Sequence, residues 1–95
     1  MSVTDTRIRQ CLDTCRQNNR TALVSFITAG DPGPGYTVAA LHSLVAGGVD
    51  ILELGIPFSD PEAEGPSIQA ANERALAHGI TLAQVLQMVE EFRTQ

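Results

Sequence analysis

The chain contains no lysine, so all six of its basic side chains are arginines. A protein Schiff base needs a lysine amine and a P-loop needs a lysine beside the phosphates, so this chain can supply neither. Any carbon–carbon chemistry on its own side chains therefore has to use carboxylates. Acidic residues outnumber basic ones by 11 to 6, giving a net charge of -5. That balance argues against nucleic acid or a membrane surface as a partner.

Long apolar runs are also missing. No stretch is long enough to span a bilayer and the N-terminus lacks the pattern of a signal peptide, so we expect a cytoplasmic protein. Cysteine is limited to Cys11 and Cys15, which join Ile8 and Leu12 in an apolar stripe at helical spacing. Because no histidine lies nearby in the sequence, this spacing favours a core role over a disulfide or zinc site, and we predict no metal site.

Helical and strand-like patterns alternate along the 95 residues, of which 43% are hydrophobic. The expected elements are a helix over 4–17, a strand over 22–28, a helix over 36–46, a strand over 51–56, a short helix over 67–77 and a helix from 81 onward. Thr4 or Asp5 is the expected N-cap of the first helix, and Thr81 with Gln84 predicts a capping box on the last. The last helix carries a broad apolar stripe of Leu82, Val85, Leu86, Val89 and Phe92.

A strand, a helix and a second strand within about 35 residues form a βαβ unit, whose strands are parallel. A two-stranded sheet is marginal alone, whereas a (β/α)8 barrel needs eight strands and about 250 residues. We therefore predict an α/β fold, a partial (β/α)8 TIM barrel with two parallel strands only. Residues 1–95 are interpreted as a single quarter-barrel domain, either cut from a longer protein or obliged to assemble with copies or partners, for example by self-association through its exposed sheet edges. A small open α/β sandwich is the alternative.

Glu53 interrupts the apolar run ILELGI over 51–56. Side chains alternate along a strand, so Leu52 and Leu54 share one face while Glu53 shares the other with Ile51. Removing an ionised group from water costs several kcal/mol unless it is paired or its pKa shifts. The pattern predicts that Glu53 points into the barrel interior near the end of its strand, with a raised pKa. Pairing with an arginine, for structure alone, is the other interpretation.

The loop after this strand carries further acids, of which Glu64 stands directly before a helix start at Gly65 and Pro66. The positive end of that helix would keep Glu64 ionised while Glu53 is less solvated. Two carboxylates in unlike settings are typical of an acid/base pair. Asp60 and Glu62 are equally consistent with ordinary solvated turn residues.

Three stretches resemble the N-terminal part of the tryptophan synthase alpha chain family: FITAGDP at 26–32, LELGIPFSDP at 52–61 and EAEGPSIQAANERALAHG at 62–79. The resemblance implies a (β/α)8 barrel lyase of tryptophan biosynthesis. Such an enzyme cleaves indole-3-glycerol phosphate to indole and glyceraldehyde 3-phosphate in a retro-aldol reaction without cofactor or metal. It also implies that Glu53 is the catalytic glutamate and that Phe26 lies in the indole pocket.

The same resemblance implies a partner, a pyridoxal phosphate-dependent beta chain that condenses indole with serine. Pro57, Phe58 and Asp60 would lie against that chain. Glu64 departs from the family pattern, which has aspartate there, and one extra methylene moves the carboxylate by more than the roughly 1 Å that can cost about a hundredfold in rate. The resemblance therefore implies that Glu64 is a weakened second catalytic carboxylate, or that the site is degenerate.

Two functions follow for the 95 residues. The first is an alpha-type lyase segment that is inactive alone because the later strands and phosphate-binding loops of a barrel are not in the sequence. The second is a non-catalytic truncated or diverged barrel fragment that acts as a self-associating or interaction module.

Overall fold

The structure is a computed structural model that describes residues 6–58 and 65–95. Its elements follow the predicted order and are α1 (Arg7–Gln17), β1 (Val24–Thr28), α2 (Thr37–Ala46), β2 (Ile51–Gly55), α3 (Pro66–Ala77) and α4 (Leu82–Thr94). The N-cap prediction for α1 was wrong. Thr6 is the N-cap, and its side chain accepts a hydrogen bond from the N–H of Arg9 at 3.1 Å.

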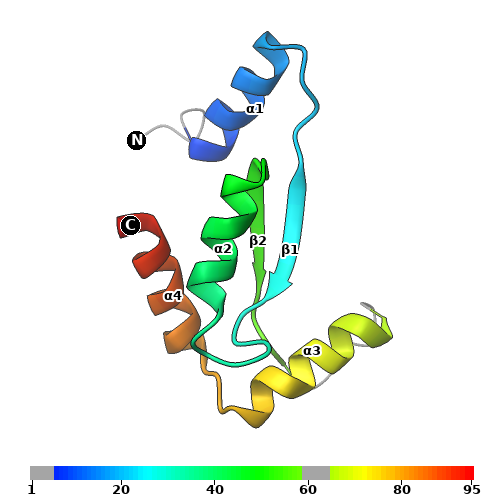
Figure 1. Cartoon of the computed structure of the whole chain (residues 1–95), viewed down its shortest axis with the longest axis vertical. Helices are drawn as coiled ribbons and strands as arrows, with labels where there is room; N and C mark the ends of the chain where they lie inside the picture. Colours follow the sequence, from blue (N-terminus) through cyan, green and yellow to red (C-terminus); the bar gives the residue numbers. More distant parts are fainter. Residues whose placement is uncertain (1–5, 59–64) are drawn as a thin grey trace.

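The two strands pair in parallel, as the βαβ pattern predicts. Their register places Val24 opposite Ile51 and Phe26 opposite Glu53. In Figure 1, α2 and α4 lie on one side of the sheet, α1 lies at the starting ends of the strands, and α3 lies at the ends to which the arrows point. Within the described part of the chain the sheet has these two strands, so each keeps an unpaired edge.

A small core lies between the sheet and α4. Its buried members come from the loop after β1, from α3, from the link between α3 and α4, and from α4: Ala29, Ala75, Ile80, Val85 and Met88. Val38 of α2 and Leu54 of β2 pack against this cluster. Leu54 therefore points toward the helices, which confirms the predicted helix-facing side of β2.

The start of α4 is defined by its own sequence. Thr81 accepts a hydrogen bond from the N–H of Gln84, and the Gln84 side chain accepts one from the N–H of Thr81 at 2.8 Å. The predicted capping box is therefore present. Ile80 and Val85, on either side of the cap, belong to the same buried cluster, as expected of a hydrophobic staple.

Two predicted core stripes are only half buried. Cys15 is 3% exposed, as predicted, but Ile8 and Leu12 on the same helix are 57% and 42% exposed. On α4, Leu82 and Leu86 are 55% and 60% exposed. The core role predicted for the α1 stripe therefore holds for Cys15 but not for Ile8 and Leu12, because two strands offer too little surface to cover either stripe fully.

No helix in ranges 6–58 and 65–95 combines the length and the apolar character needed to cross a membrane.

Candidate functional site

Glu53 and Phe26 are neighbours on the sheet face that points away from the core. The parallel register pairs them directly, and Leu54, which follows Glu53, points to the opposite, helix-covered face. Phe26 is 37% exposed and Glu53 is also exposed. A carboxylate and an aromatic ring thus stand side by side on an open surface formed by two strands.

Gly55 provides the space that the Phe26 ring occupies. A Cβ added at Gly55 would lie 2.5 Å from Cζ and 2.9 Å from Cε2 of Phe26, closer than real Cβ atoms come to carbon. The ring therefore leans over the glycine, at the last residue of β2 and at the end of the sheet where α3 lies. A flat apolar group thus lies at the end of β2, next to the strand position that carries Glu53.

The expectation that Glu53 is shielded from water was wrong for this chain. Glu53 is exposed because, among the residues that the structure describes, β1 and β2 form one wall and no opposing strand encloses their open face. The ion pairs among residues 6–58 and 65–95 join Arg9 to Asp13, Arg20 to Asp50, and Arg74 to Asp31. Because none of these pairs involves Glu53, the structural-clamp interpretation has no support in the described residues.

A groove of about 280 Å³ runs beside Phe26 at the end of β1. It is lined by residues of β1, of the following loop, of α2 and of α3: Phe26, Ile27, Thr28, Asp31, Ala40, Ser67, Ile68 and Ala71. Glu53 is not among them, since the groove lies on the β1 side. Phe26 is thus the residue common to the groove and to the Glu53 face.

Arg74 fastens α3 to the loop after β1. Its guanidinium donates to both carboxylate oxygens of Asp31, at 2.6 Å and 3.1 Å, and this carboxylate raises the pKa of Arg74. No sequence pattern predicts this pair. A spacing of 43 residues gives no local signal, although an acid in a glycine- and proline-rich loop at the end of a strand was available as a clue.

The loop itself is fixed by Gly30 and Thr37. The N–H of Gly30 donates to the hydroxyl of buried Thr37 at 2.8 Å. Gly30 has a φ of +85°, and a Cβ there would overlap the side chain of Ile80. The turn after β1 is thereby held against the core, which positions Asp31 for Arg74.

The remaining predicted site residues follow β2. Pro57 is buried within the chain, whereas Phe58 is 47% exposed. Glu64 and Asp60 lie outside the described residues. Gly65, with a φ of +88°, is the N-cap of α3, so the helix begins directly after the position of Glu64, as predicted.

A second polar cluster lies at the opposite ends of the strands. Arg20 donates to both carboxylate oxygens of Asp50, at 2.7 Å and 2.8 Å, and the N–H of Leu23 donates to one of them at 2.8 Å. These hydrogen bonds lower the pKa of Asp50 to about 2. Burial raises the pKa of the neighbouring Cys15 thiol.

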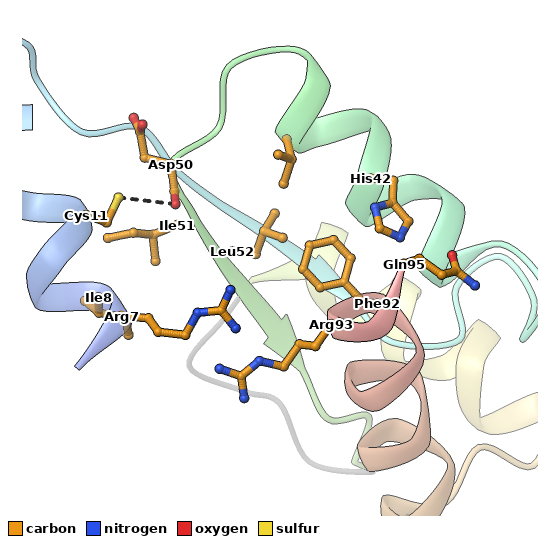
Figure 2. Close-up of a pocket in the computed structure, with 11 residues that line it drawn as sticks. Arg7, Ile8, Cys11, His42, Asp50, Ile51, Leu52, Phe92, Arg93 and Gln95 are labelled. Carbon is orange, nitrogen blue, oxygen red and sulfur yellow. Dashed lines mark hydrogen bonds between the residues drawn. The ribbon is translucent and has the colours of Figure 1, made fainter. Parts of the chain in front are cut away.

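A hollow of about 590 Å³ also lies at these starting ends. Figure 2 shows it between α1, the start of β2 and the end of α4, with Arg7 and Arg93 on one side and His42 and Phe92 on another. It does not reach Glu53. The predicted chemistry therefore lies outside this hollow, on the sheet face near Phe26.

Comparisons with known proteins agree with this fold. The family model described as tryptophan synthase alpha chain matches residues 12–95. The tryptophan synthase alpha chain of Alkalilimnicola ehrlichii is 58% identical over 89 residues, which cover 94% of this chain and 32% of that relative. The one from Laribacter hongkongensis is 60% identical over 87 residues, covering 92% and 33%. This chain thus spans about a third of the length of these relatives.

Solved structures give the same picture. Tryptophan synthase subunit alpha from Legionella pneumophila str. Paris superimposes with a TM-score of 0.91 at 55% identity, covering 94% of this chain and 34% of that one. A Mycobacterium tuberculosis tryptophan synthase structure gives a TM-score of 0.84 at 42% identity, covering 90% and 33%. Both the sequence and the arrangement of elements are therefore similar to one part of a larger barrel.

Proposed function

This chain belongs to the tryptophan synthase alpha chain family, and from that premise we propose that its open sheet face is the first wall of a lyase reaction chamber. The proposed reaction is the cleavage of indole-3-glycerol phosphate to indole and glyceraldehyde 3-phosphate. The observation that carries the proposal is the pairing of Glu53 with Phe26 on the face that α2 and α4 leave uncovered. Enclosing that face requires further strands, so the 95 residues alone are inactive in this proposal.

In the proposed mechanism Glu53 moves protons. A proton is added to C3 of the indole ring, the bond between C3 and the glyceryl carbon breaks, and its electrons return to the ring. The hydroxyl on that glyceryl carbon loses its proton as the aldehyde forms. A carboxylate positioned for both transfers contributes typically 10²–10⁴-fold in such chemistry.

The electron sink is the protonated indole ring, so no lysine imine is required of a chain that has no lysine. We propose that this chain needs no cofactor of its own and that pyridoxal phosphate belongs to the beta chain. Phe26 contributes an aromatic face for the indole ring, and aromatic pairs gain about 0.5–1.5 kcal/mol beyond area burial.

Glu64 is proposed as the second carboxylate, in a weakened form. It precedes the α3 N-terminus, where the helix dipole favours a negative charge. Its extra methylene displaces the carboxylate from the position that an aspartate would give. Glu64→Asp in an active assembly is therefore expected to raise the rate of indole release, by up to about a hundredfold. An unchanged rate would remove Glu64 from the mechanism.

The proposed partner is a tryptophan synthase beta chain, which would lie against Phe58 and the residues after it. The exposure of Phe58, three residues beyond the end of β2, supports this surface. Pro57 is buried and would then support the loop from within, while Asp60 would contribute from the loop itself. A cytoplasmic location is part of the same proposal.

The function is tested by measuring indole release from indole-3-glycerol phosphate. The isolated 95 residues are compared with a graft that joins them to the remaining two thirds of the Laribacter hongkongensis alpha chain, with the alpha chain of that relative as the reference. The graft is expected to release indole and the isolated chain is not. A folded graft that releases none, even with Glu64→Asp, would refute the lyase proposal.

A second candidate function is self-association or docking without catalysis. The observation in its favour is the number of large apolar side chains left in water, among them Ile8, Leu23, Val24, Ile56, Leu82 and Leu86. In the described part of the chain each strand also keeps an unpaired edge, which is a template for further pairing. Stable oligomers of the isolated chain, combined with an inactive graft, would favour this candidate over the lyase.

A further inference from the structure

We propose, in contrast to the expectation from the cysteine spacing alone, that Cys11, Cys15 and the sequence-distant Asp50 form a binding site for a thiophilic divalent cation of the zinc class. This site lies at the starting ends of the strands, away from Glu53, and is independent of the proposed lyase activity. The fourth coordination position would be held by water, as in zinc sites with three protein ligands.

The three ligand atoms already lie together. The sulfur of Cys11, the sulfur of Cys15 and a carboxylate oxygen of Asp50 are all within 4.8 Å of one another. In a tetrahedral site with metal–sulfur bonds of about 2.3 Å, the edges between ligands are roughly 3.8 Å. Small side-chain rotations therefore suffice to close the site around one ion. Neither cysteine is in a disulfide.

Two elements hold these ligands in place. The cysteines are one helical turn apart on α1, so their sulfur atoms project from the same side of the helix. The thiol of Cys11 donates to the backbone carbonyl of Asp50 at 3.5 Å, which Figure 2 shows as a dashed line between α1 and the start of β2. The Asp50 carboxylate is 10% exposed, so the site is shielded from water without being closed.

A positive group already bridges two of the ligands. The Arg20 guanidinium nitrogen that donates to Asp50 at 2.7 Å also donates to the sulfur of Cys15 at 3.2 Å. The Arg20 side chain is 49% exposed and can turn toward solvent. A divalent cation would take the place of this guanidinium and would form shorter contacts with the same oxygen and sulfur.

Binding releases two protons and leaves one net negative charge on the three ligands and the cation. Each thiol loses its proton to solvent, the two thiolates and the Asp50 carboxylate contribute three negative charges, and the cation contributes two positive ones. No bond is oxidised or reduced. Soft thiolate ligands select zinc-class ions over magnesium or calcium, which take oxygen ligands.

The test uses Co²⁺ as a coloured probe for zinc, titrated into the reduced 95-residue chain. A sulfur-to-cobalt charge-transfer band that saturates at one ion per chain and is abolished by added Zn²⁺ is expected. Cys11→Ser and Cys15→Ser are each expected to weaken binding about tenfold or more, because loss of a supporting residue alone costs 10–100-fold. Circular dichroism of each variant checks that α1 still folds.

Arg20→Gln is expected to change Co²⁺ affinity in the opposite direction to the cysteine substitutions. Removing the competing guanidinium is expected to tighten Co²⁺ binding. If Arg20 instead held the ligands in place, its removal would weaken Co²⁺ binding. Asp13→Asn is the control, because it removes an exposed acid of the same helix that pairs with Arg9 at 3.8 Å.

Binding unchanged by either cysteine substitution, or no charge-transfer band in the parent chain, would overturn the proposal. No tightening with Arg20→Gln would refute replacement of the guanidinium.

Discussion

Gly55 shows how the absence of a side chain can shape a site. The Phe26 ring occupies the position that a Cβ at residue 55 would take, and its paired neighbour is Glu53. A larger residue at position 55 would force the ring out of this position. Because Glu53 and Gly55 are two residues apart on β2, they lie on the same face of the strand. One supplies the carboxylate and the other leaves the space that the Phe26 ring occupies.

Gly55→Ala is accordingly expected to destabilise the chain and to disturb the Phe26 position. Overpacking of this kind typically costs about 1–3 kcal/mol. Gly35→Ala is the matched control, since a Cβ at Gly35 meets no atom within 4 Å. Urea unfolding followed by circular dichroism should show a lower midpoint for Gly55→Ala only. Equal midpoints for both variants would contradict the close packing of Phe26 on Gly55.

Asp50 makes the stability of the chain depend on pH in the acid range. Its pKa is about 2 in the folded chain against an ordinary value of 3.8, because Arg20 and the N–H of Leu23 stabilise the ionised form. A lowered pKa contributes stability that is full above the unfolded value and is lost as pH falls through the folded value. The difference in unfolding free energy between the parent and Asp50→Asn should therefore shrink between pH 3.8 and about 2.

Other carboxylates titrate in the same range, but they are common to the parent and the variant and cancel in that difference. Asp13→Asn, measured over the same pH series, checks that the effect belongs to Asp50. A parent-to-variant difference that stays constant down to pH 2 would show that the Arg20 pair does not act in solution.

Among the elements, α4 has an N-terminus that is stabilised by residues close to it in the sequence. Thr81 and Gln84 satisfy each other's backbone N–H groups, and Ile80 and Val85 pack on either side of the cap. Thr81→Ala is expected to lower the free energy of unfolding by about 1 kcal/mol, the usual cost of removing a threonine cap. Thr21→Ala, at an exposed position in the link before β1, should change it little. Denaturant titration distinguishes the two.

The sequence was sufficient for the order of elements, the parallel pairing and the capping box, because each has a short-range signal. Periodicity, turn residues and caps all lie within a few positions of one another. The Arg74–Asp31 and Arg20–Asp50 pairs join residues 43 and 30 positions apart, and no local pattern identifies such partners.

The exposure of Glu53 and of half of the α1 and α4 stripes could not be predicted for a different reason. Alternation and helical spacing identify the face of an element, but whether that face is buried depends on which other elements are present to cover it. Leu54 is covered by the core cluster, whereas Leu82 and Leu86 have no covering element among the described residues.

At the scale of the whole molecule, the chain is an α/β unit with one covered and one open sheet face. The exposed apolar residues and free strand edges predict association in solution, and sedimentation should give masses above the 10.1 kDa of one chain, increasing with concentration. Leu82→Glu with Leu86→Glu should reduce this association, while Ala83→Glu, an exposed control between them, should affect it less. A monomer at all concentrations would contradict this reading of the surface.

The most direct measurement of the central claim is the rate of indole release by the completed barrel with and without the Glu53 carboxylate. Glu53→Gln in the graft preserves size and removes the acid, and Glu90→Gln makes the same change at an exposed position of α4. The account predicts that Glu53→Gln lowers the rate of indole release about 10²–10⁴-fold and that Glu90→Gln leaves it unchanged. Equal rates for the two variants would show that the open sheet face is not the wall of a reaction chamber.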